Sequence, residues 1–337
     1  MERSGICVAG NMIVDITYPI ERWPRQCELT HITEGITRTM GGAVCNTIVD
    51  LAVLDPSLRL KALGKVGEDP DGEWILSNMR QYPNIDISSV RREGITSFTS
   101  VMSERETKKR TFFHYYGANA HFSEEDIDWE QIHCKILHIG YILLLNALDA
   151  GDVEFGTKMA RLLCHARERG MKTSIDVVSE CGDRFQSKVL PALKYTDYCV
   201  INELEASAST GIPLRDDNDV LLAENMPLAL AALKRMGVST WAVIHAAEGG
   251  FGLDERNAFH SSASLPLPAG YIKGTVGAGD AFCAGVLCAA YRGESMQAAI
   301  ELGTASAACS LSAVGATEGM RSAAEAMALY RSLRENG

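Results

Sequence analysis

Short apolar runs alternate with amphipathic stretches along most of this 337-residue chain. Six of the apolar runs indicate buried strands, because they are brief and bounded by polar or turn-forming residues. They lie at residues 6–9, 60–63, 135–139, 173–177, 198–201 and 240–244. Apolar positions at helical spacing predict helices at residues 43–54, 72–81, 153–169, 183–193 and 219–236. Strands and helices in alternation predict an α/β fold in which helices cover both faces of a parallel sheet.

The last third of the chain has an almost entirely helical pattern. Residues 279–291, 296–311 and 323–334 each predict a helix. The second of these is rich in alanine, glycine and serine between residues 303 and 310. Because such small side chains let helix backbones approach one another, we expect this helix to pack closely on its neighbours.

Two segments interrupt the alternation. Residues 16–40 and 95–116 are rich in threonine, isoleucine, phenylalanine and tyrosine and show no helical period. In the second segment, two strand-like runs flank a charged turn and so predict a hairpin. β-Structure that leaves the α/β body at two separate points predicts a small β-lid over a cleft. The body then comprises residues 1–15, 41–94 and 117–337; the alternative is a pair of surface hairpins with no catalytic part.

Composition and charge exclude several classes of protein. The formal net charge is −11, and the densest basic patch is only Lys108-Lys109-Arg110, which argues against nucleic-acid binding. No apolar run is long enough to span a membrane, and the first residues lack the pattern of a secretory signal. The ten cysteines show neither a disulfide framework nor a Cys-x-x-Cys spacing. We therefore expect a cytoplasmic protein with reduced cysteines and no membrane partner.

The loop Gly-Thr-Val-Gly-Ala-Gly-Asp at residues 274–280 precedes an apolar, helix-forming run. Gly277, Ala278 and Gly279 are small enough for several backbone N–H groups to converge on one point, and a helix start adds partial positive charge there. Asp280 places a carboxylate beside this anion-binding turn. Such an arrangement suits the transfer of a phosphoryl group to a hydroxyl group. The alternative is an ordinary glycine-rich turn in which Asp280 caps the helix.

Further motifs follow the predicted strands, at the edge of a parallel sheet where ligands bind. Gly10-Asn11 and then Asp15 follow the first strand, and Gly41-Gly42 opens the first long helix. The others are the glycine-rich residues 64–72 after the second strand, Asn202-Glu203-Leu204-Glu205 after the fifth and Ala247-Glu248-Gly249-Gly250 after the sixth.

These motifs, in this order, resemble the PfkB, or ribokinase-like, family of carbohydrate and nucleoside kinases. Both signatures of that family are present, the first at residues 41–46 with residues 64–72 behind it, and the second at residues 274–285. The resemblance extends from Gly10 to Gly315. It implies a three-layer α/β/α fold with a mostly parallel central sheet and a small β-sheet lid, in an ATP-dependent carbohydrate kinase.

The resemblance also implies roles for the matched positions. Asp280 is expected to be the general base, and the backbone N–H groups of Gly277, Ala278 and Gly279 are expected to stabilise the charge of the moving phosphoryl group. The residues implied to bind the sugar are Asn11, Asp15, Gly41, Gly42, Asn46 and, in the lid, His114. Turn-forming and helix-capping roles are the alternative for the glycines and asparagines.

On the nucleotide side, the resemblance implies that Asn202 and Glu205 organise Mg²⁺ near the triphosphate, with Glu205 acting through a water molecule. An Asn-x-x-Glu pair on its own is more typical of a helix cap. His245, Gly250 and Thr304 are the other positions implied to contact ATP.

The chain departs from the family pattern at Gly274 and after Asp176. Gly274 stands where the family often has an aspartate that shapes a monovalent-cation site, which removes the main reason to expect activation by K⁺. Asp176 lacks the asparagine that often follows two positions later, so we interpret it as a strand-end residue.

We therefore expect a kinase that phosphorylates a hydroxymethyl group of a small sugar or sugar derivative. The alternatives are a nucleoside kinase of the same fold and a non-catalytic sugar-binding protein on a kinase scaffold. The segment Gly117-Ala118-Asn119-Ala120 favours the sugar branch. Lid strands of relatives often pair between subunits, so the resemblance also suggests a homodimer through the lid.

Overall fold

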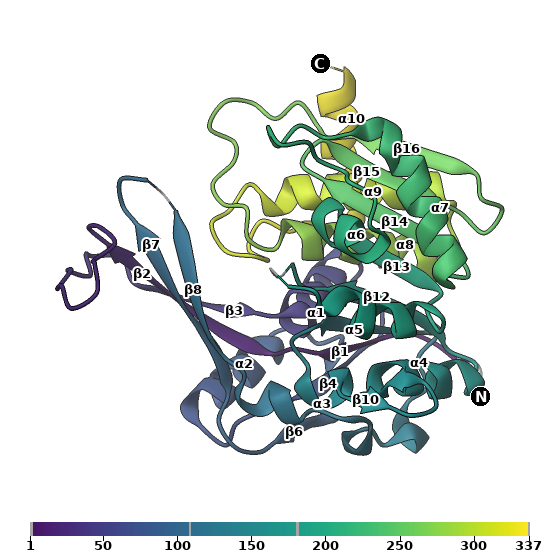
Figure 1. Cartoon of the computed structure of the whole chain (residues 1–337), viewed down its shortest axis with the longest axis horizontal. Helices are drawn as coiled ribbons and strands as arrows, with labels where there is room; N and C mark the ends of the chain where they lie inside the picture. The colour runs from purple at the N-terminus through teal and green to yellow at the C-terminus, as the bar shows by residue number, and fades with distance from the viewer. Residues whose placement is uncertain (1–2, 108, 180–181, 336–337) are drawn as a thin grey trace.

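A computed structural model describes residues 3–107, 109–179 and 182–335 of the chain. Lys108 of the basic patch and Cys181 therefore lie outside the described residues. A large sheet lies between two layers of helices, and a separate small sheet projects from one side of this body (Figure 1). The α/β fold and the small second sheet expected from the sequence are both confirmed.

The large sheet has the strand order β16-β15-β14-β13-β12-β9-β1-β4-β5, with β6 also paired to β4. Its strands are β1 (Ile6–Gly10), β4 (Leu60–Val66), β5 (Ile85–Asp86), β6 (Val90–Arg92), β9 (Ile136–Ile142), β12 (Lys172–Val177), β13 (Tyr198–Asn202), β14 (Trp241–Ala246), β15 (Gly249–Leu253) and β16 (Phe259–Ala263). All pairs from β14 to β5 are parallel, whereas β15 and β16 pair in antiparallel fashion. The sequence pattern predicted the six central strands and missed this edge hairpin.

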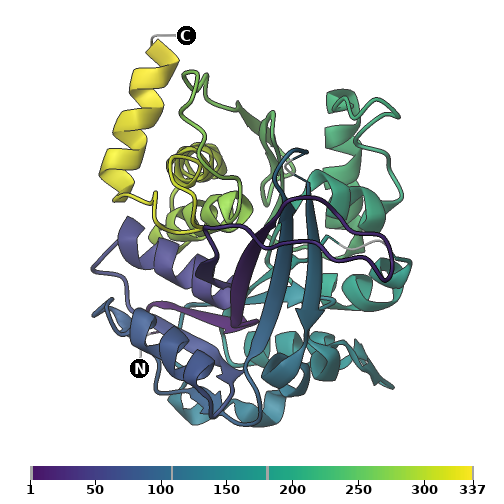
Figure 2. The same cartoon turned by 90° about the vertical axis from the view of Figure 1, so that its left-hand side faces the viewer.

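Helices cover both faces of the large sheet, as Figures 1 and 2 show. One layer contains α1 (Ala43–Leu54), α2 (Pro70–Met79), α8 (Ala278–Arg292), α9 (Met296–Ser310) and α10 (Ala323–Glu335). The other contains α3 (Asn146–Asp149), α4 (Lys158–Glu168), α5 (Arg184–Leu193), α6 (Glu203–Thr210) and α7 (Met226–Met236). Short 3-10 helices lie at Gly117–His121, Glu124–Asp126, Trp129–Gln131 and Ala223–Asn225.

Successive residues of each central strand point into opposite cores. Ile6 and Val8 of β1 pack with the layer of α1 and α8, whereas Cys7 and Ala9 pack with the layer of α4 to α7. Because both faces of the sheet are buried, these strands are continuously apolar rather than alternating. This double burial explains why short uninterrupted apolar runs were the signal for strands.

Two helices begin later than the sequence pattern predicts. Residues 153–169 were expected to be one helix, but a two-strand hairpin of β10 (Gly151–Asp152) and β11 (Gly156–Thr157) occupies its start. α4 begins after it because the Thr157 hydroxyl accepts a hydrogen bond from the N–H of Ala160 at 3.1 Å. Likewise, the helix expected at 219–236 begins at Met226, with Pro227 in its first turn.

Helices α8 and α9 pack against each other through small residues. A Cβ atom placed on Gly285 of α8 would lie 2.7 Å from Cα of Gly303 of α9, so the two backbones touch. The close packing expected of the small-residue stretch 303–310 is therefore confirmed at its first residue.

The small sheet has the order β3-β2-β7-β8. Its strands are β2 (Ile13–Ile20), β3 (Thr37–Gly41), β7 (Ser97–Glu104) and β8 (Arg110–Tyr115). β7 and β8 form the predicted antiparallel hairpin, and β2 pairs with β7 in parallel. β2 already starts at Ile13, only three residues after the end of β1. We call this sheet the lid, and its free end points away from the body (Figure 1).

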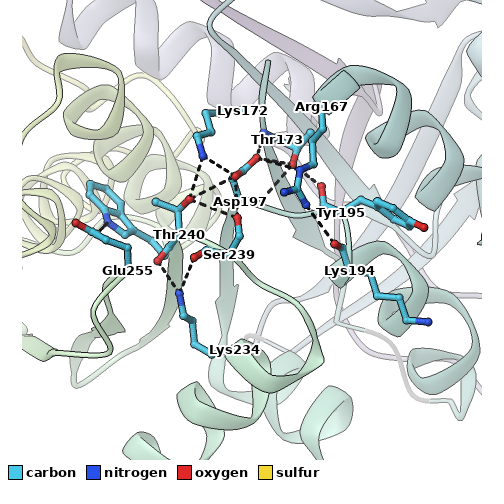
Figure 3. A network of polar contacts seen from close by, with 11 residues as sticks. Arg167, Lys172, Thr173, Lys194, Tyr195, Asp197, Lys234, Ser239, Thr240 and Glu255 are labelled. Carbon is cyan, nitrogen blue, oxygen red and sulfur yellow. Dashed lines mark hydrogen bonds and ion pairs between the residues drawn. The ribbon is translucent and has the colours of Figure 1, made fainter. Parts of the chain in front are cut away.

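Asp197 directly precedes β13, at the amino ends of the parallel strands, and its side chain holds three chain segments together (Figure 3). Its carboxylate accepts hydrogen bonds from Nζ of Lys172 at 2.8 Å, from the N–H of Thr173 at 3.0 Å and from Oγ of Ser239 at 2.8 Å. Burial acts to raise the pKa of Asp197, but these donors outweigh it and hold the pKa below its ordinary value. The network therefore ties the start of β12 to the residues before β13 and β14.

None of the helices in the described ranges is long and apolar enough to cross a membrane. All nine cysteines in those ranges are free thiols, and seven of them are buried. The burial of these seven agrees with the expected core position of most of the cysteines.

Candidate active site

The carboxyl ends of the parallel strands meet along one edge of the large sheet. Gly10 at the end of β1 pairs with Gly140 of β9, and Asn202 at the end of β13 pairs with His245 of β14. Asp176 lies between them near the end of β12. Parallel pairing therefore places in one row the residues Asn11, Tyr141, Asp176, Asn202 and His245.

Asp280 is the third residue of α8, and its side chain is buried against other elements. Nδ2 of Asn46, from the first turn of α1, donates to Oδ2 of Asp280 at 2.9 Å. The hydroxyl of Tyr141, at the end of β9, donates to Oδ1 at 2.7 Å. Both carboxylate oxygens are thus held by partners outside α8, and the carboxylate makes no capping bond to its own helix.

The environment of Asp280 combines burial with two donors. Burial raises the pKa of Asp280, whereas the hydrogen bonds from Tyr141 and Asn46 act to lower it. The N-terminus of α8 also favours a negative charge at this position. The outcome is an oriented carboxylate with a raised pKa, which is a suitable acceptor for a hydroxyl proton.

The loop before Asp280 leaves little room for side chains. Gly277 has φ +80°, and a Cβ there would lie 2.5 Å from Cβ of Ala316. A Cβ on Gly279 would lie 3.0 Å from Cε1 of His245. Because the first N–H groups of a helix lack partners within the helix, the backbone of Gly277, Ala278 and Gly279 offers donors to an anion.

Asn11 connects β1 to the end of β9. Its Oδ1 accepts a hydrogen bond from the backbone N–H of Tyr141 at 2.5 Å, and its Nδ2 donates to the carbonyl of Leu144 at 3.2 Å. The carbonyl of Asn11 lies against Gly42, where a Cβ would be only 2.6 Å away and where φ is +88°. The asparagine is fully buried, so its side chain fixes the geometry of this corner.

Asp15 lies on β2, and its side chain lies against Gly41, the last residue of β3. A Cβ on Gly41 would come within 2.0 Å of Oδ2 of Asp15, so only glycine permits this approach. Burial raises the pKa of Asp15 to about 6, and the charge of Asp280 acts in the same direction. Asp15 and Asp280 therefore influence each other electrostatically across the site.

His114 is linked to Asp15 through the lid strand between them. Thr99 of β7 lies beside Asp15, where its hydroxyl acts to lower the pKa of that carboxyl, and Oγ1 of Thr99 lies 3.1 Å from Nδ1 of His114. Burial lowers the pKa of His114, so the imidazole is neutral at pH 7.

A largely apolar cavity of about 510 Å³ lies on the other side of the loop. His245 and Gly279 are among its lining residues, together with Thr304 and Ala307 of α9, and burial lowers the pKa of His245 to about 4. Gly250 is not among the lining residues, because it packs on the ring of Phe282, where a Cβ would lie 2.6 Å from Cζ. Its neighbour Gly249 lines the cavity instead.

A smaller cavity of about 280 Å³ connects this region to Asp280. It shares His245 and Gly279 with the apolar cavity, so the two are adjacent. Its other lining residues are Tyr141, Asp176, Val177, Val178, Ser179, Asn202, Glu205 and Asp280. The N-termini of α6 and α8 both point here, which gives the cavity a field that favours phosphate.

Asn202 and Glu205 form a capping box at the start of α6. The Asn202 side chain accepts hydrogen bonds from the N–H groups of Leu204 and Glu205, and Oε2 of Glu205 accepts from the N–H of Asn202. Oε1 of Glu205 also accepts from Ser179 at 2.8 Å. Burial raises the pKa of Glu205 to about 7, and burial with the charge of Glu205 raises the pKa of Asp176. Asn202 and Glu205 therefore do cap α6, which was the alternative to a role in Mg²⁺ binding, and both residues also line the smaller cavity.

Oxygen ligands for Mg²⁺ are present in this cavity, although they do not form a complete set. In the described parts of the chain, no group of three or more His, Cys, Asp or Glu side chains could hold a metal ion. Mg²⁺ commonly binds through one or two carboxylates together with water and substrate phosphates. Asp176 and Glu205 fit such a shared site. A Cβ on Gly274 would lie 2.7 Å from the carbonyl oxygen of Val314, so an aspartate there would need the loop to shift.

The structure thus brings together Asn11, Asp15, Gly41, Gly42, Asn46, Tyr141 and Asp280 at one side of the loop. Sequence reasoning missed Tyr141 and assigned Asp176 only a strand-end position. Both follow the rule that located the other motifs, because each stands at the carboxyl end of a predicted strand. Tyr141 carried no glycine-rich or acidic signature of its own.

Known proteins resemble this chain over a range that includes both the α/β body and the lid. The model of the pfkB family carbohydrate kinases matches residues 4–323. The ribokinase of Arabidopsis thaliana, solved with ribose and ATP, is 20% identical and superimposes with a TM-score of 0.78 over 98% of this chain and 99% of its own. A ribokinase from Thermotoga maritima is 19% identical and superimposes with a TM-score of 0.77 over 97% of this chain and 99% of its own. A nucleoside kinase from Methanocaldococcus jannaschii is 17% identical and superimposes with a TM-score of 0.75 over 98% of this chain and 100% of its own.

Among curated sequences, the bifunctional protein HldE of Gluconobacter oxydans strain 621H is 23% identical over 321 residues. The alignment covers 92% of this chain and 61% of that protein. The chain therefore spans about three fifths of the length of this relative.

Proposed function

The chain belongs to the pfkB family of carbohydrate kinases, and on that premise we propose that it transfers the γ-phosphoryl group of ATP to a hydroxymethyl group of a small sugar or sugar derivative. The observation that carries this proposal is the position of Asp280. Its carboxylate is held by Asn46 and Tyr141 at the N-terminus of α8, beside a cavity suited to phosphate.

ATP would occupy the two adjacent cavities. The apolar cavity next to Thr304 is large enough for a purine ring, and the smaller cavity leads from His245 to Asp280. Support also comes from the ribokinase of Arabidopsis thaliana, which was solved with ribose and ATP. A direct contact of Gly250 with the nucleotide stays a prediction, and Gly249 is the better placed of the two glycines.

Asp176, Asn202 and Glu205 would hold Mg²⁺ together with the phosphates, Glu205 through a water molecule. Bound there, the ion would neutralise phosphate charge as it develops. The raised pKa values of Asp176 and Glu205 support this role, because a nearby cation would relieve the cost of burying both carboxylates.

In the proposed reaction, the acceptor hydroxyl oxygen forms a bond to the γ-phosphorus while the bond to the bridging oxygen of ADP breaks. Asp280 accepts the hydroxyl proton. The N–H groups of Gly277, Ala278 and Gly279 stabilise the charge on the phosphoryl oxygens, and Asp15 and Asn46 orient the acceptor. Placement of the acceptor between lid and body excludes water, which would otherwise compete for the phosphoryl group.

The test is the Asp280→Asn variant assayed for ADP formation and for ATP binding. We expect turnover to fall by a factor on the order of 10² to 10⁴, the usual contribution of a general base, with ATP binding retained. Asp86→Asn is the matched control, because Asp86 lies on β5, away from this site, and pairs with Lys61 on the surface. Full activity of the Asp280→Asn variant would reject the proposal. A panel of pentoses, hexoses and nucleosides separates a sugar kinase from a nucleoside kinase.

We also propose that the protein forms a homodimer through the lid. One face of the lid exposes Phe113 (51% exposed) and Tyr115 (43%) of β8, and Trp23 (47%), which follows β2, lies beside them. Trp23 and Phe113 stack on each other with centroids 6.1 Å apart, which forms an exposed apolar patch. Analytical ultracentrifugation should give a dimer for the native chain and a monomer for the Phe113→Ser/Tyr115→Ser variant.

A further inference from the structure

We infer that the acceptor is an uncharged polyol that binds as a hydrogen-bond donor, and that sugar acids and sugar phosphates are rejected. This inference rests on the proposed kinase function and narrows its acceptor. Three observations support it: the residues in the lid row that contains Asp15, the directions of the hydrogen bonds around the site, and the signs of the charges that act on its carboxyl groups.

The lid presents one row of side chains beside Asp15. Strand register aligns Asp15 of β2 with Thr39 of β3 and Thr99 of β7, and aligns Thr99 with His114 of β8. Residues that are directly opposite in neighbouring strands share a face of the sheet. This row therefore contains one carboxylate, two hydroxyl groups and one neutral imidazole, and no cation.

The basic residue nearest to this row along β3 lies on the other face of the lid. Arg38 alternates with Thr39, so its side chain points away from Asp15. It forms an ion pair with Asp71 and lies over the ring of Trp74, both in α2. Arg38 therefore contacts α2 on the face of the lid opposite to Asp15, and it does not supply a positive charge to the acceptor.

One side-chain nitrogen in the lid row has no partner. Oγ1 of Thr99 lies 3.1 Å from Nδ1 of His114, whereas Nε2 of His114 is buried and has no hydrogen-bond partner. A hydroxyl group suits Nε2 in either tautomer of the neutral imidazole, because a hydroxyl both donates and accepts, whereas an anion suits only one. The imidazole therefore favours a hydroxyl group.

The α/β body also leaves a buried polar atom without a hydrogen-bond partner beside the site. Asn46 donates to Asp280 through Nδ2, while its Oδ1 has no partner. The hydroxyl of Tyr141 donates to Asp280, and Nδ2 of Asn11 donates to the carbonyl of Leu144. Of the other donors near Asp15 and Asp280, the backbone N–H groups of Gly277, Ala278 and Gly279 are assigned to the phosphoryl group. The unpaired side-chain atom that remains is the acceptor Oδ1 of Asn46, beside the two carboxylates. A hydroxyl group of a polyol can donate to them, whereas a carboxylate or ionised phosphate only accepts.

The charges acting on the site have one sign. The charge of Asp280 raises the pKa of Asp15. In the described ranges, no lysine or arginine contributes to the pKa of Asp15 or Asp280. An anionic acceptor held beside Asp15 would meet like charge from the lid row in addition to the charge of the nucleotide, and no cation in that row offsets it, which is a means of rejection.

The test is a set of acceptors that share a carbon skeleton and differ in charge: a pentose and a hexose, the corresponding aldonic acids, and their phosphate monoesters. Product would be detected as ADP release and as the phosphorylated acceptor by mass spectrometry. We expect kcat/KM for at least one uncharged member to exceed that of its acid and its phosphate by on the order of 100-fold. Equal or better turnover of an acid or phosphate would overturn the inference while leaving the kinase function intact.

Two further results complete the test. Asp15→Asn should narrow the difference between charged and uncharged acceptors, because it removes one negative charge and keeps the shape; an unchanged ratio would count against the inference. Ser100→Ala on the other face of the lid keeps all charges and should leave that ratio as it is. If neither the panel nor the amino analogues of its sugars give any ADP above the Asp280→Asn background, the kinase proposal itself fails and the inference fails with it.

Discussion

The hydroxyl of Tyr141 donates a hydrogen bond of 2.7 Å to Oδ1 of Asp280, although the two residues are 139 positions apart in the chain. Asn46 holds the other oxygen of the same carboxylate. The orientation of the proposed base is therefore set by β9 and α1 rather than by its own helix. The backbone N–H of Tyr141 also binds Asn11, so one residue supports both the base and the acceptor corner.

Tyr141→Phe should lower activity through the pKa of Asp280. The variant removes a donor that lowers this pKa, so the pKa rises further above its ordinary value. Because the base must be ionised, the acid limb of the kcat/KM profile should move to higher pH, and kcat at pH 7 should fall by about 10-fold. The measurement is a pH–rate profile of both proteins.

Tyr195→Phe is the control for this substitution, because Tyr195 packs on Phe155 at the opposite edge of the sheet. It should leave the profile unchanged. An unshifted acid limb in Tyr141→Phe, with the fold intact by circular dichroism, would show that this hydrogen bond does not tune Asp280.

Ala307→Phe should weaken ATP binding selectively. Ala307 lies on α9 and lines the 510 Å³ cavity, so a phenyl ring there would occupy space assigned to the purine. We expect KM for ATP to rise by about 10-fold or more with KM for the acceptor little changed. Ala298→Phe on the same helix lies outside the lining residues and is the matched control. Equal effects of the two variants would argue that the cavity does not bind the nucleotide.

Gly285→Ala should destabilise the protein. The added Cβ would lie 2.7 Å from Cα of Gly303, so α8 and α9 would have to separate. Overpacking of this kind costs about 1–3 kcal/mol in the free energy of unfolding. Gly151→Ala is the control, because no atom lies within 4 Å of a Cβ placed there. Urea denaturation should show a lower midpoint for Gly285→Ala only.

Asp197→Asn should destabilise the protein in a pH-dependent way. The pKa of Asp197 lies below its ordinary value in the folded state, so its contribution is present above the unfolded pKa of about 3.9 and is lost as pH falls through the folded pKa. At pH 7 the variant should lose about 1.5–3 kcal/mol of unfolding free energy, and the difference should shrink below pH 4. Chemical denaturation at several pH values measures this, and a pH-independent loss would contradict the assignment.

Much of the fold could be predicted because both faces of the sheet are buried. Runs such as residues 198–201 are apolar throughout and lie between clear helical patterns, so their type and order were readable. The helix starts were less readable: Thr157 caps α4 with a single hydroxyl inside a stretch that keeps helical spacing. The β15–β16 hairpin escaped because its glycines carry no strand signal.

The site was predictable only where a residue carried its own local signature. Asp280 follows a small-residue loop, and Asn11 and Asp15 follow a strand. Tyr141 depends on which strand lies beside β1, and that neighbour, β9, is more than a hundred residues away in the sequence. Strand order is a property of the whole sheet, so no local pattern could place the tyrosine next to Asp280.

Asp15 is part of the lid sheet itself. Asp15 lies on β2, and only Asn11 and Met12 separate this strand from β1. Asn119 clamps Met12 through both its backbone N–H, at 3.1 Å, and its carbonyl, at 3.2 Å. A rotation of the small sheet about that clamp would swing Asp15 toward or away from Asp280. The distance between Asp15 and Asp280 would therefore change with lid position, so a pair of spectroscopic labels on β2 and α8 would report opening and closing of the lid.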